Sequence, residues 1–174
     1  MTIHEEKNVF NIAIEGNFDD CQNLVKAMFN DEKFSSSINM SGVNSINWAR
    51  IVAQAVYYFY AYFKIGNGQS LSFSVPTGNF GDIYAGYLAK KLGLPIDKLI
   101  VATNKNDILH RAISGGDYTQ KKVEETNTPS MDIQIASNFE RLLYDVKDCN
   151  SDVTKDVMSK IKNNTYQIDN LSLI

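Results

Sequence analysis

One stretch of this sequence combines residue types and spacing that fit the binding of an anion. It reads Ser-Phe-Ser-Val-Pro-Thr-Gly-Asn-Phe-Gly-Asp, from Ser72 to Asp82. The order predicts a strand, a turn bracketed by Gly78 and Gly81, and then a helix. Glycines let backbone N–H groups approach a phosphate closely, and the amides and dipole at a helix N-terminus favour negative charge. The spacing alone supports phosphate binding and a ligand-free tight turn equally.

Three polar side chains accompany these glycines: the hydroxyl of Thr77, the amide of Asn79 and the carboxylate of Asp82. Asp82 would either cap the helix or orient a neighbouring group. The stretch is not a P-loop, because no Gly-Lys-Ser/Thr follows, and it is not a Gly-x-Gly-x-x-Gly dinucleotide fingerprint.

Other polar groups stand before helical segments, where each has a structural alternative. Arg50 could pair with a substrate phosphate, but a solvated or structural charge is the favoured interpretation. His110 fits a structural or exposed role better than acid–base work. The remaining candidates could either bind a ligand or cap a helix. They are Asn44, Ser45, Asn47, Thr103, Asn104, Asn106 and Asp107.

The elements that position these groups follow from hydrophobic periodicity and breaker residues. Strands are predicted at 8–14, 71–75 and 98–102, and residues 35–45 are predicted as a loop, with 130–135 as a possible extended segment. Helices are predicted at 17–30, 46–64, 79–92, from about 108, 139–146 and 153–161. The alternation predicts an α/β fold, a mostly parallel open sheet flanked by helices. The 46–64 helix is apolar on most faces and is expected to be largely buried, with its aromatic residues in the core.

Composition excludes several classes of function. The 174 residues carry 17 basic and 20 acidic side chains, which gives 17 − 20 = −3, and 44% of residues are hydrophobic. A basic excess typical of nucleic-acid binders is missing, and the longest apolar run, 51–63, is shorter than the roughly 20 residues that span a membrane. No secretory signal opens the chain, and two cysteines with two histidines support neither a disulfide framework nor a metal site. We therefore expect a cytoplasmic protein with no nucleic-acid or membrane partner.

Four segments in the same order resemble the bacterial and fungal type of threonine synthase, over roughly residues 8–146. One is the run from Ser74 to Asp82, followed by Tyr-Ala-Gly-Tyr-Leu-Ala-Lys-Lys-Leu-Gly-Leu-Pro from Tyr84 to Pro95. The others are Ile-Glu-Gly-Asn-Phe-Asp-Asp-Cys-Gln (14–22), Asn-Ser-Ile-Asn-Trp-Ala-Arg (44–50) and Ala-Thr-Asn-x-Asn-Asp (102–107). The resemblance implies a partial pyridoxal phosphate enzyme of the tryptophan-synthase-like fold, fold type II.

The resemblance also implies a reaction and a cofactor site. The family is a carbon–oxygen lyase acting on phosphate, which converts O-phospho-L-homoserine and water into L-threonine and phosphate in threonine biosynthesis. Gly78, Asn79 and Phe80 would hold the phosphate of pyridoxal phosphate mainly through backbone amides, with Asp82 completing the site. Gly81 is expected to serve close packing rather than cofactor contact.

The resemblance also implies that two parts of the family's active site lie outside this sequence. The family's Schiff-base lysine would lie upstream of the chain and the partner of the pyridine nitrogen downstream, so no catalytic residue and no metal ligand is assigned. We expect residues 1–174 to be one α/β unit, the central fragment of a larger enzyme, inactive alone, and residues 1–7 to be a flexible or engineered start. Self-association through exposed fragment surfaces is a further expectation.

Two alternative functions remain open at the level of sequence. One is a stand-alone α/β module that binds a phosphorylated metabolite without catalysis. The other is a fragment of a serine or threonine dehydratase of the same fold, which the segments around Asn44 and Asn104 disfavour.

Overall fold

The computed structural model describes residues 6–16 and 18–162, so most of the expected flexible start at residues 1–7 lies outside the described residues. The chain separates into two compact units, Met1–Ser41 and Gly42–Ile174, and each is described here by itself.

The first unit contains two helices, α1 (Phe18–Asn30) and α2 (Glu32–Ser37). The Asp31 side chain caps α2 by accepting a 3.0 Å hydrogen bond from Phe34 N. The prediction of a loop from residue 35 is therefore wrong for its first residues, because this cap starts a short helix. The predicted strand at 8–14 is also wrong: the segment is irregular and exposed, and no described strand pairs with it.

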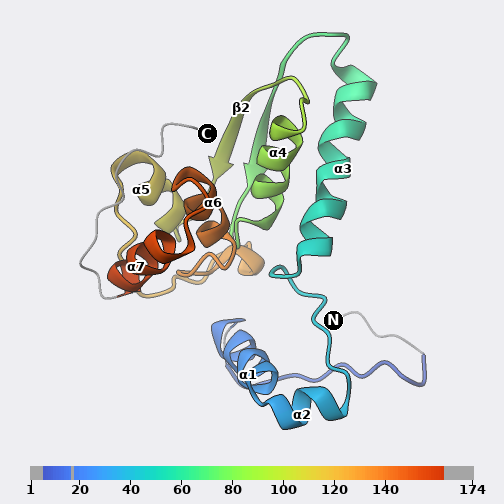
Figure 1. Cartoon of the computed structure of the whole chain (residues 1–174), viewed down its shortest axis with the longest axis vertical. Helices are drawn as coiled ribbons and strands as arrows, with labels where there is room; N and C mark the ends of the chain where they lie inside the picture. The colour runs from blue at the N-terminus through green and yellow to red at the C-terminus, as the bar shows by residue number, and fades with distance from the viewer. Residues whose placement is uncertain (1–5, 17, 163–174) are drawn as a thin grey trace. The chain divides into compact units, whose positions relative to one another are not determined.

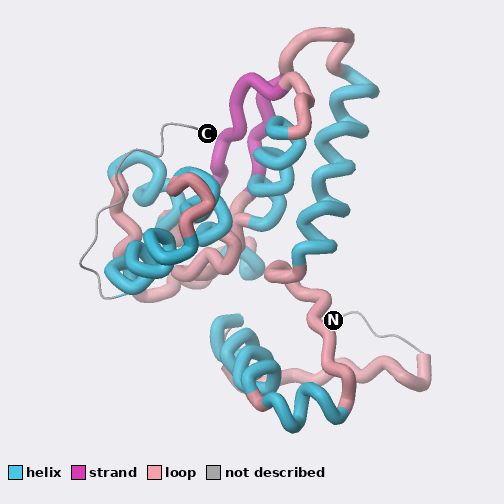
Figure 2. Tube along the Cα trace, in the orientation of Figure 1, coloured by secondary structure: helices cyan, strands magenta, loops and turns pink. Residues whose placement is uncertain are grey.

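The second unit is built on two parallel strands, β1 (Leu71–Pro76) and β2 (Ile96–Ala102), which form the sheet of the described residues. Figure 2 shows them side by side. Val75 pairs with Val101, and an irregularity between Leu71 and Phe73 shifts the register at the start of β1. Pro76 can donate no ladder bond, and it is the last residue of its strand, as its missing N–H predicts.

The chain enters the second unit through α3 (Trp48–Ile65), and α4 (Gly81–Lys91) connects β1 to β2. After β2 come α5 (Ile108–Gly115), the 3-10 helix η1 (Pro129–Met131), α6 (Phe139–Val146) and α7 (Ser151–Lys162). In Figure 1, α4 lies beside the sheet of the second unit with α3 packed on α4, and α5, α6 and α7 lie toward the carboxyl ends of the strands. The predicted α/β class is confirmed, whereas the 3-10 turn starts where an extended segment was considered. No described helix is both long and apolar enough to cross a membrane.

The core forms where α3 and α4 pack together and where α6 joins them. Helix α3 buries Ile51, Ala55 and Tyr58 on one face, but Tyr57 and Phe63 remain 64% and 77% exposed. The prediction of a largely buried helix is therefore correct for one face only. Apolar composition did not reveal that the described residues cover α3 from a single side.

Candidate functional site

The predicted anion-binding stretch lies at the carboxyl end of β1, where the chain turns into α4. Thr77 fixes the start of the turn, because its N–H donates to Ala102 O on β2 at 2.8 Å. The Thr77 hydroxyl, one of the polar groups predicted beside the glycines, donates to Val75 O at 2.6 Å. Thr77 is buried. The turn is thus tied to both strands of the sheet at its first residue.

The backbone of this turn presents unused hydrogen-bond donors. The amide N–H groups of Gly78, Asn79 and Phe80 donate to no acceptor within the part of the chain that the structure describes. Phe80 precedes α4 in the left-handed conformation, with φ 66° and ψ 5°. The first amides of α4 also have no intrahelical acceptor, so successive donors gather at a helix N-terminus. This arrangement can bind an anion.

Gly78 allows the chain to pass close to another segment here. A Cβ on Gly78 would lie 3.2 Å from Met131 Cα and 3.3 Å from Ser130 O. A Cβ on Gly81 would lie 3.4 Å from Asn138 Nδ2, close to an ordinary van der Waals distance, so the packing role expected of Gly81 stays a prediction. Gly78 therefore also permits close packing against the η1 segment, a role beyond the phosphate approach that its sequence context predicted.

Asn79 is anchored through both its backbone and its side chain. Its carbonyl oxygen accepts hydrogen bonds from Asn138 N at 3.0 Å and from Asn138 Nδ2 at 3.1 Å. Its side-chain Oδ1 accepts from the Ser137 hydroxyl at 3.2 Å. The loop is consequently positioned by the residues that lead into α6.

Asp82 lies in the first turn of α4 but makes no capping hydrogen bond. Its Oδ1 is buried without a hydrogen-bond partner among the described residues, and burial raises the pKa of this carboxyl above its ordinary range. The Tyr58 hydroxyl donates to the backbone carbonyl of Asp82 at 2.9 Å. The side chain lines a small cavity of about 250 Å³ between α3, β1 and α4, together with Tyr57 and Phe73.

The polar residues after β2 bind one another. Asn104 Nδ2 donates to Thr126 and Thr128 hydroxyls and, at 2.7 Å, to Asp132 Oδ1. Asn106 is buried and donates to Glu124 O at 2.8 Å. Their side chains therefore hold the segment before α6 against the end of β2, and the capping alternative is not their observed role.

The candidates before α3 behave as structural groups. Asn47 caps the helix by accepting from Ala49 N at 2.9 Å, and Asn44 accepts from Ile46 N at 3.2 Å. The exposed Arg50 donates to Val43 O at 3.3 Å. His110 is exposed on α5 and lines neither described cavity.

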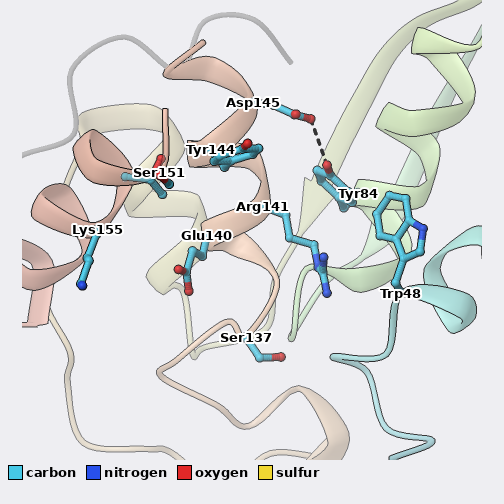
Figure 3. Close-up of a pocket in the computed structure, with 10 residues that line it drawn as sticks. Trp48, Tyr84, Ser137, Glu140, Arg141, Tyr144, Asp145, Ser151 and Lys155 are labelled. Carbon is cyan, nitrogen blue, oxygen red and sulfur yellow. Dashed lines mark hydrogen bonds between the residues drawn. The ribbon is translucent and has the colours of Figure 1, made fainter. Parts of the chain in front are cut away.

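A larger pocket of about 820 Å³ lies beside α4 and α6 (Figure 3). Arg141 extends from α6 toward α3, with its guanidinium carbon 5.4 Å from the ring centre of Trp48. Tyr84 donates to Asp145 Oδ2 at 2.9 Å on the pocket wall, as the dashed line in the figure marks. Ser137 also lines the pocket, so one short segment contributes to both the pocket and the loop.

Three residues near the loop, Ser137, Asn138 and Arg141, were not predicted from the sequence. Asn138 directly precedes α6, where an asparagine predicts a helix cap, yet it makes no capping bond. Two of its hydrogen-bond partners lie 59 and 93 residues away, at Asn79 and Ser45. No local pattern signals contacts of that range.

Several known proteins similar to this chain are threonine synthases. The chain is 55% identical over 163 residues to the threonine synthase of Pseudomonas aeruginosa, covering 93% of this chain and 35% of that protein. It matches the solved structure of a threonine synthase with bound pyridoxal phosphate from Brucella melitensis, with a TM-score of 0.79 and 55% identity over 89% of this chain and 34% of that one. The solved structure of threonine synthase from yeast matches with a TM-score of 0.81 and 46% identity, over 97% of this chain and 36% of that one.

No family model matches the chain. The chain spans about a third of the length of these relatives. Sequence identity and structural similarity nevertheless agree, and the resemblance inferred from four short segments is confirmed. Over that third of their length, the chain belongs to the threonine synthase family.

Proposed function

We propose that this chain supplies the cofactor-phosphate site of a threonine synthase. The parent activity is the conversion of O-phospho-L-homoserine and water into L-threonine and phosphate, with pyridoxal phosphate as the cofactor. One observation carries the proposal: the free amides of Gly78, Asn79 and Phe80 meet the N-terminus of α4 at the carboxyl end of β1. Ligands bind at this edge in open α/β sheets.

The residues present fit a phosphate group. A phosphate needs several convergent donors, and the loop offers backbone N–H groups with the positive end of a helix dipole behind them. Backbone donors carry no net charge, so the site favours an anion through geometry rather than through lysine or arginine. Gly78, Asn79 and Phe80 would hold the phosphate, and the N–H of Asp82, in the first turn of α4, would complete the set.

Pyridoxal phosphate supplies an electron sink that stabilises negative charge on the substrate carbon. The task of this chain is to bind and orient that group. A phosphate held at the loop fixes one end of the cofactor, and rigid positioning of reactants lowers the entropic part of a barrier. No lysine of this chain is assigned a catalytic role in the proposal.

Binding can be tested by nuclear magnetic resonance on the isotope-labelled chain. Pyridoxal phosphate and inorganic phosphate should both shift the amide signals of residues 78–83, whereas pyridoxal without phosphate should leave them in place. Gly78→Ala should weaken the shift, because the added Cβ must displace the loop from Met131. Gly115→Ala is the matched control, since an added Cβ there meets nothing within 4 Å. Saturable shifts elsewhere, with none at 78–83, would refute the loop as the phosphate site.

Activity requires a separate test. The gene that encodes this chain should restore growth without threonine to a bacterium that lacks threonine synthase, if its whole reading frame includes the rest of the family's length. The chain alone is expected not to do so. Rescue of a dehydratase-deficient strain instead would favour the dehydratase alternative, and tight phosphate-ligand binding without rescue by the reading frame would favour the binding module.

We further propose a cytoplasmic location, no nucleic-acid or membrane partner, and self-association of the isolated chain. The last rests on large apolar side chains of α3 that are 45–77% exposed: Val52, Val56, Tyr57, Tyr60 and Phe63. Light scattering across a concentration series should detect dimers or larger species, and a constant monomer mass would contradict the proposal.

A further inference from the structure

The backbone carbonyl of Asn79 accepts two hydrogen bonds from a single residue. Asn138 N and Asn138 Nδ2 lie 3.0 and 3.1 Å from Asn79 O. A carbonyl oxygen has two lone pairs, so this pair of donors fills its capacity. Asn138 is fully buried, and water cannot compete for either bond.

Anchoring that carbonyl also fixes the next amide. The peptide unit between Asn79 and Phe80 is planar and trans, so the Phe80 N–H points opposite to the Asn79 carbonyl. With the oxygen held by Asn138, the Phe80 N–H is directed away from Asn138. This N–H is one of the three free donors of the loop.

The side chain of Asn138 is itself held in one orientation. Its Nδ2 also donates to Ser45 O at 2.9 Å, and its Oδ1 accepts from Arg141 Nε at 3.0 Å. Arg141 Nη2 donates to Ile46 O at 2.8 Å. The donor and acceptor ends of the amide are therefore assigned without ambiguity, and the segment before α3 is joined to the loop.

The following residue secures the loop in a second way. The Phe80 ring packs edge-on against Phe139, with ring centres 5.4 Å apart, and both rings are buried. Phe139 in turn stacks on Tyr118 at 5.0 Å. A left-handed conformation at a residue with a large side chain is sparsely populated unless its surroundings determine it. Asn138 and Phe139 provide those surroundings.

We propose that Asn138, oriented by Arg141, is a positioning residue that sets the direction of the Phe80 N–H in the phosphate-binding loop. This inference rests on the proposed function of that loop. Asn138 has no role as a catalytic residue, since it acts on the ligand only through Asn79 and Phe80.

The test compares Asn138→Ala with wild type in the amide titration with inorganic phosphate and pyridoxal phosphate. The variant keeps the backbone bond to Asn79 O and loses the bonds of the side-chain amide. These are the bonds from Nδ2 to Asn79 O, Ser45 O and Ser137 Oγ, and the one that Oδ1 accepts from Arg141 Nε. We expect phosphate affinity to fall about tenfold, the value of one lost hydrogen bond, and the Phe80 amide to shift most weakly. Gln134→Ala is the matched control, because Gln134 is a buried amide that accepts from Lys121 N and donates to Asn106.

The two variants separate positioning from general stability. Both should lower the melting temperature, but Gln134→Ala should bind phosphate within about twofold of wild type. Should Asn138→Ala not fold, Arg141→Lys replaces it, since it removes the bond from Arg141 Nε that orients Asn138 Oδ1 and keeps the charge. Wild-type affinity in the folded variant would overturn this inference alone. A wild-type chain without any phosphate-dependent shift would instead overturn the proposed function.

Discussion

Tyr84 on α4 donates a hydrogen bond from its hydroxyl to Asp145 Oδ2 on α6, at 2.9 Å across 61 residues of sequence. Asp145 is also 3.5 Å from Lys91 Nζ, and its side chain is 12% exposed. Burial, and then this bond to the carboxylate, raise the pKa of Tyr84 above its ordinary value. The pair joins α4, which follows the glycine-containing turn after β1, to α6, which follows Asn138.

Tyr84→Phe should lower the free energy of unfolding by about 1–2 kcal/mol, because a hydrogen bond to a buried charge is lost. Urea denaturation at pH 7 measures the change. Tyr144→Phe is the control: Tyr144 lies on the same helix as Asp145 and is 40% exposed. A loss of equal size in both variants would show that the Tyr84 bond contributes nothing specific.

Asp117 gives the chain an acid-sensitive contribution to stability. Hydrogen bonds from Thr119, and then from Arg111, lower the pKa of Asp117 to about 2. A lowered pKa in the folded state stabilises the fold above the ordinary carboxyl pKa and loses this effect as pH falls through 2. Because the side chain is 43% exposed, Asp117→Asn should cost less than about 1 kcal/mol at pH 7. The difference from wild type should shrink in unfolding measurements between pH 4 and pH 2, and a constant difference would refute the assignment.

The contribution of Asp82 to stability should depend on pH in the direction opposite to that of Asp117. The pKa of Asp82 is raised by burial, so ionisation of this carboxyl destabilises the fold as pH rises above 3.8. Asp82→Asn should therefore stabilise the chain at pH 7, by about 1 kcal/mol for relief of an unpaired buried oxygen, and should have little effect below pH 4. Thermal unfolding of wild type and Asp82→Asn from below pH 4 to pH 7 measures this difference in stability. Equal melting temperatures at pH 7 would mean that the carboxylate finds a partner in solution.

The path from β1 through the loop to α4 could be predicted because its signals are local. Alternating apolar residues, Pro76 and the two glycines mark the strand, its end and the turn. The strand predicted at 8–14 failed because a strand requires a partner, and β propensity alone supplies none. Asn138 could not be found, since its role depends on Asn79 and Ser45 being brought together by the fold. Which apolar faces of α3 are covered also depends on the fold, so its composition alone predicted a largely buried helix.

Gly86 lies where α4 packs tightly against Tyr58 of α3. A Cβ at this position would lie 2.6 Å from Tyr58 Cε1 and 2.9 Å from Leu99 Cδ2, distances that force a neighbour to move. Gly86→Ala should destabilise the chain by about 1–3 kcal/mol, although alanine favours a helix more than glycine does. Gly115→Ala is the matched control in a helix with open space around the added atom. Chemical denaturation of both variants tests the packing, and stabilisation by Gly86→Ala would show that Tyr58 moves aside at no cost.

Phe80 has an unfavourable left-handed backbone conformation, but its side chain is buried and well packed. Its φ of 66° suits glycine, but its ring is only 2% exposed and packs on Phe139. Phe80→Ala should cost about 3–5 kcal/mol through the cavity that it leaves. Phe80→Gly removes the same ring and relieves the left-handed strain, so it should be more stable than Phe80→Ala by about 1 kcal/mol. This order reverses the usual ranking of alanine over glycine, and equilibrium unfolding of the two variants measures it. If alanine proves more stable than glycine at this position, the left-handed backbone of the loop is not retained once Phe139 loses its partner.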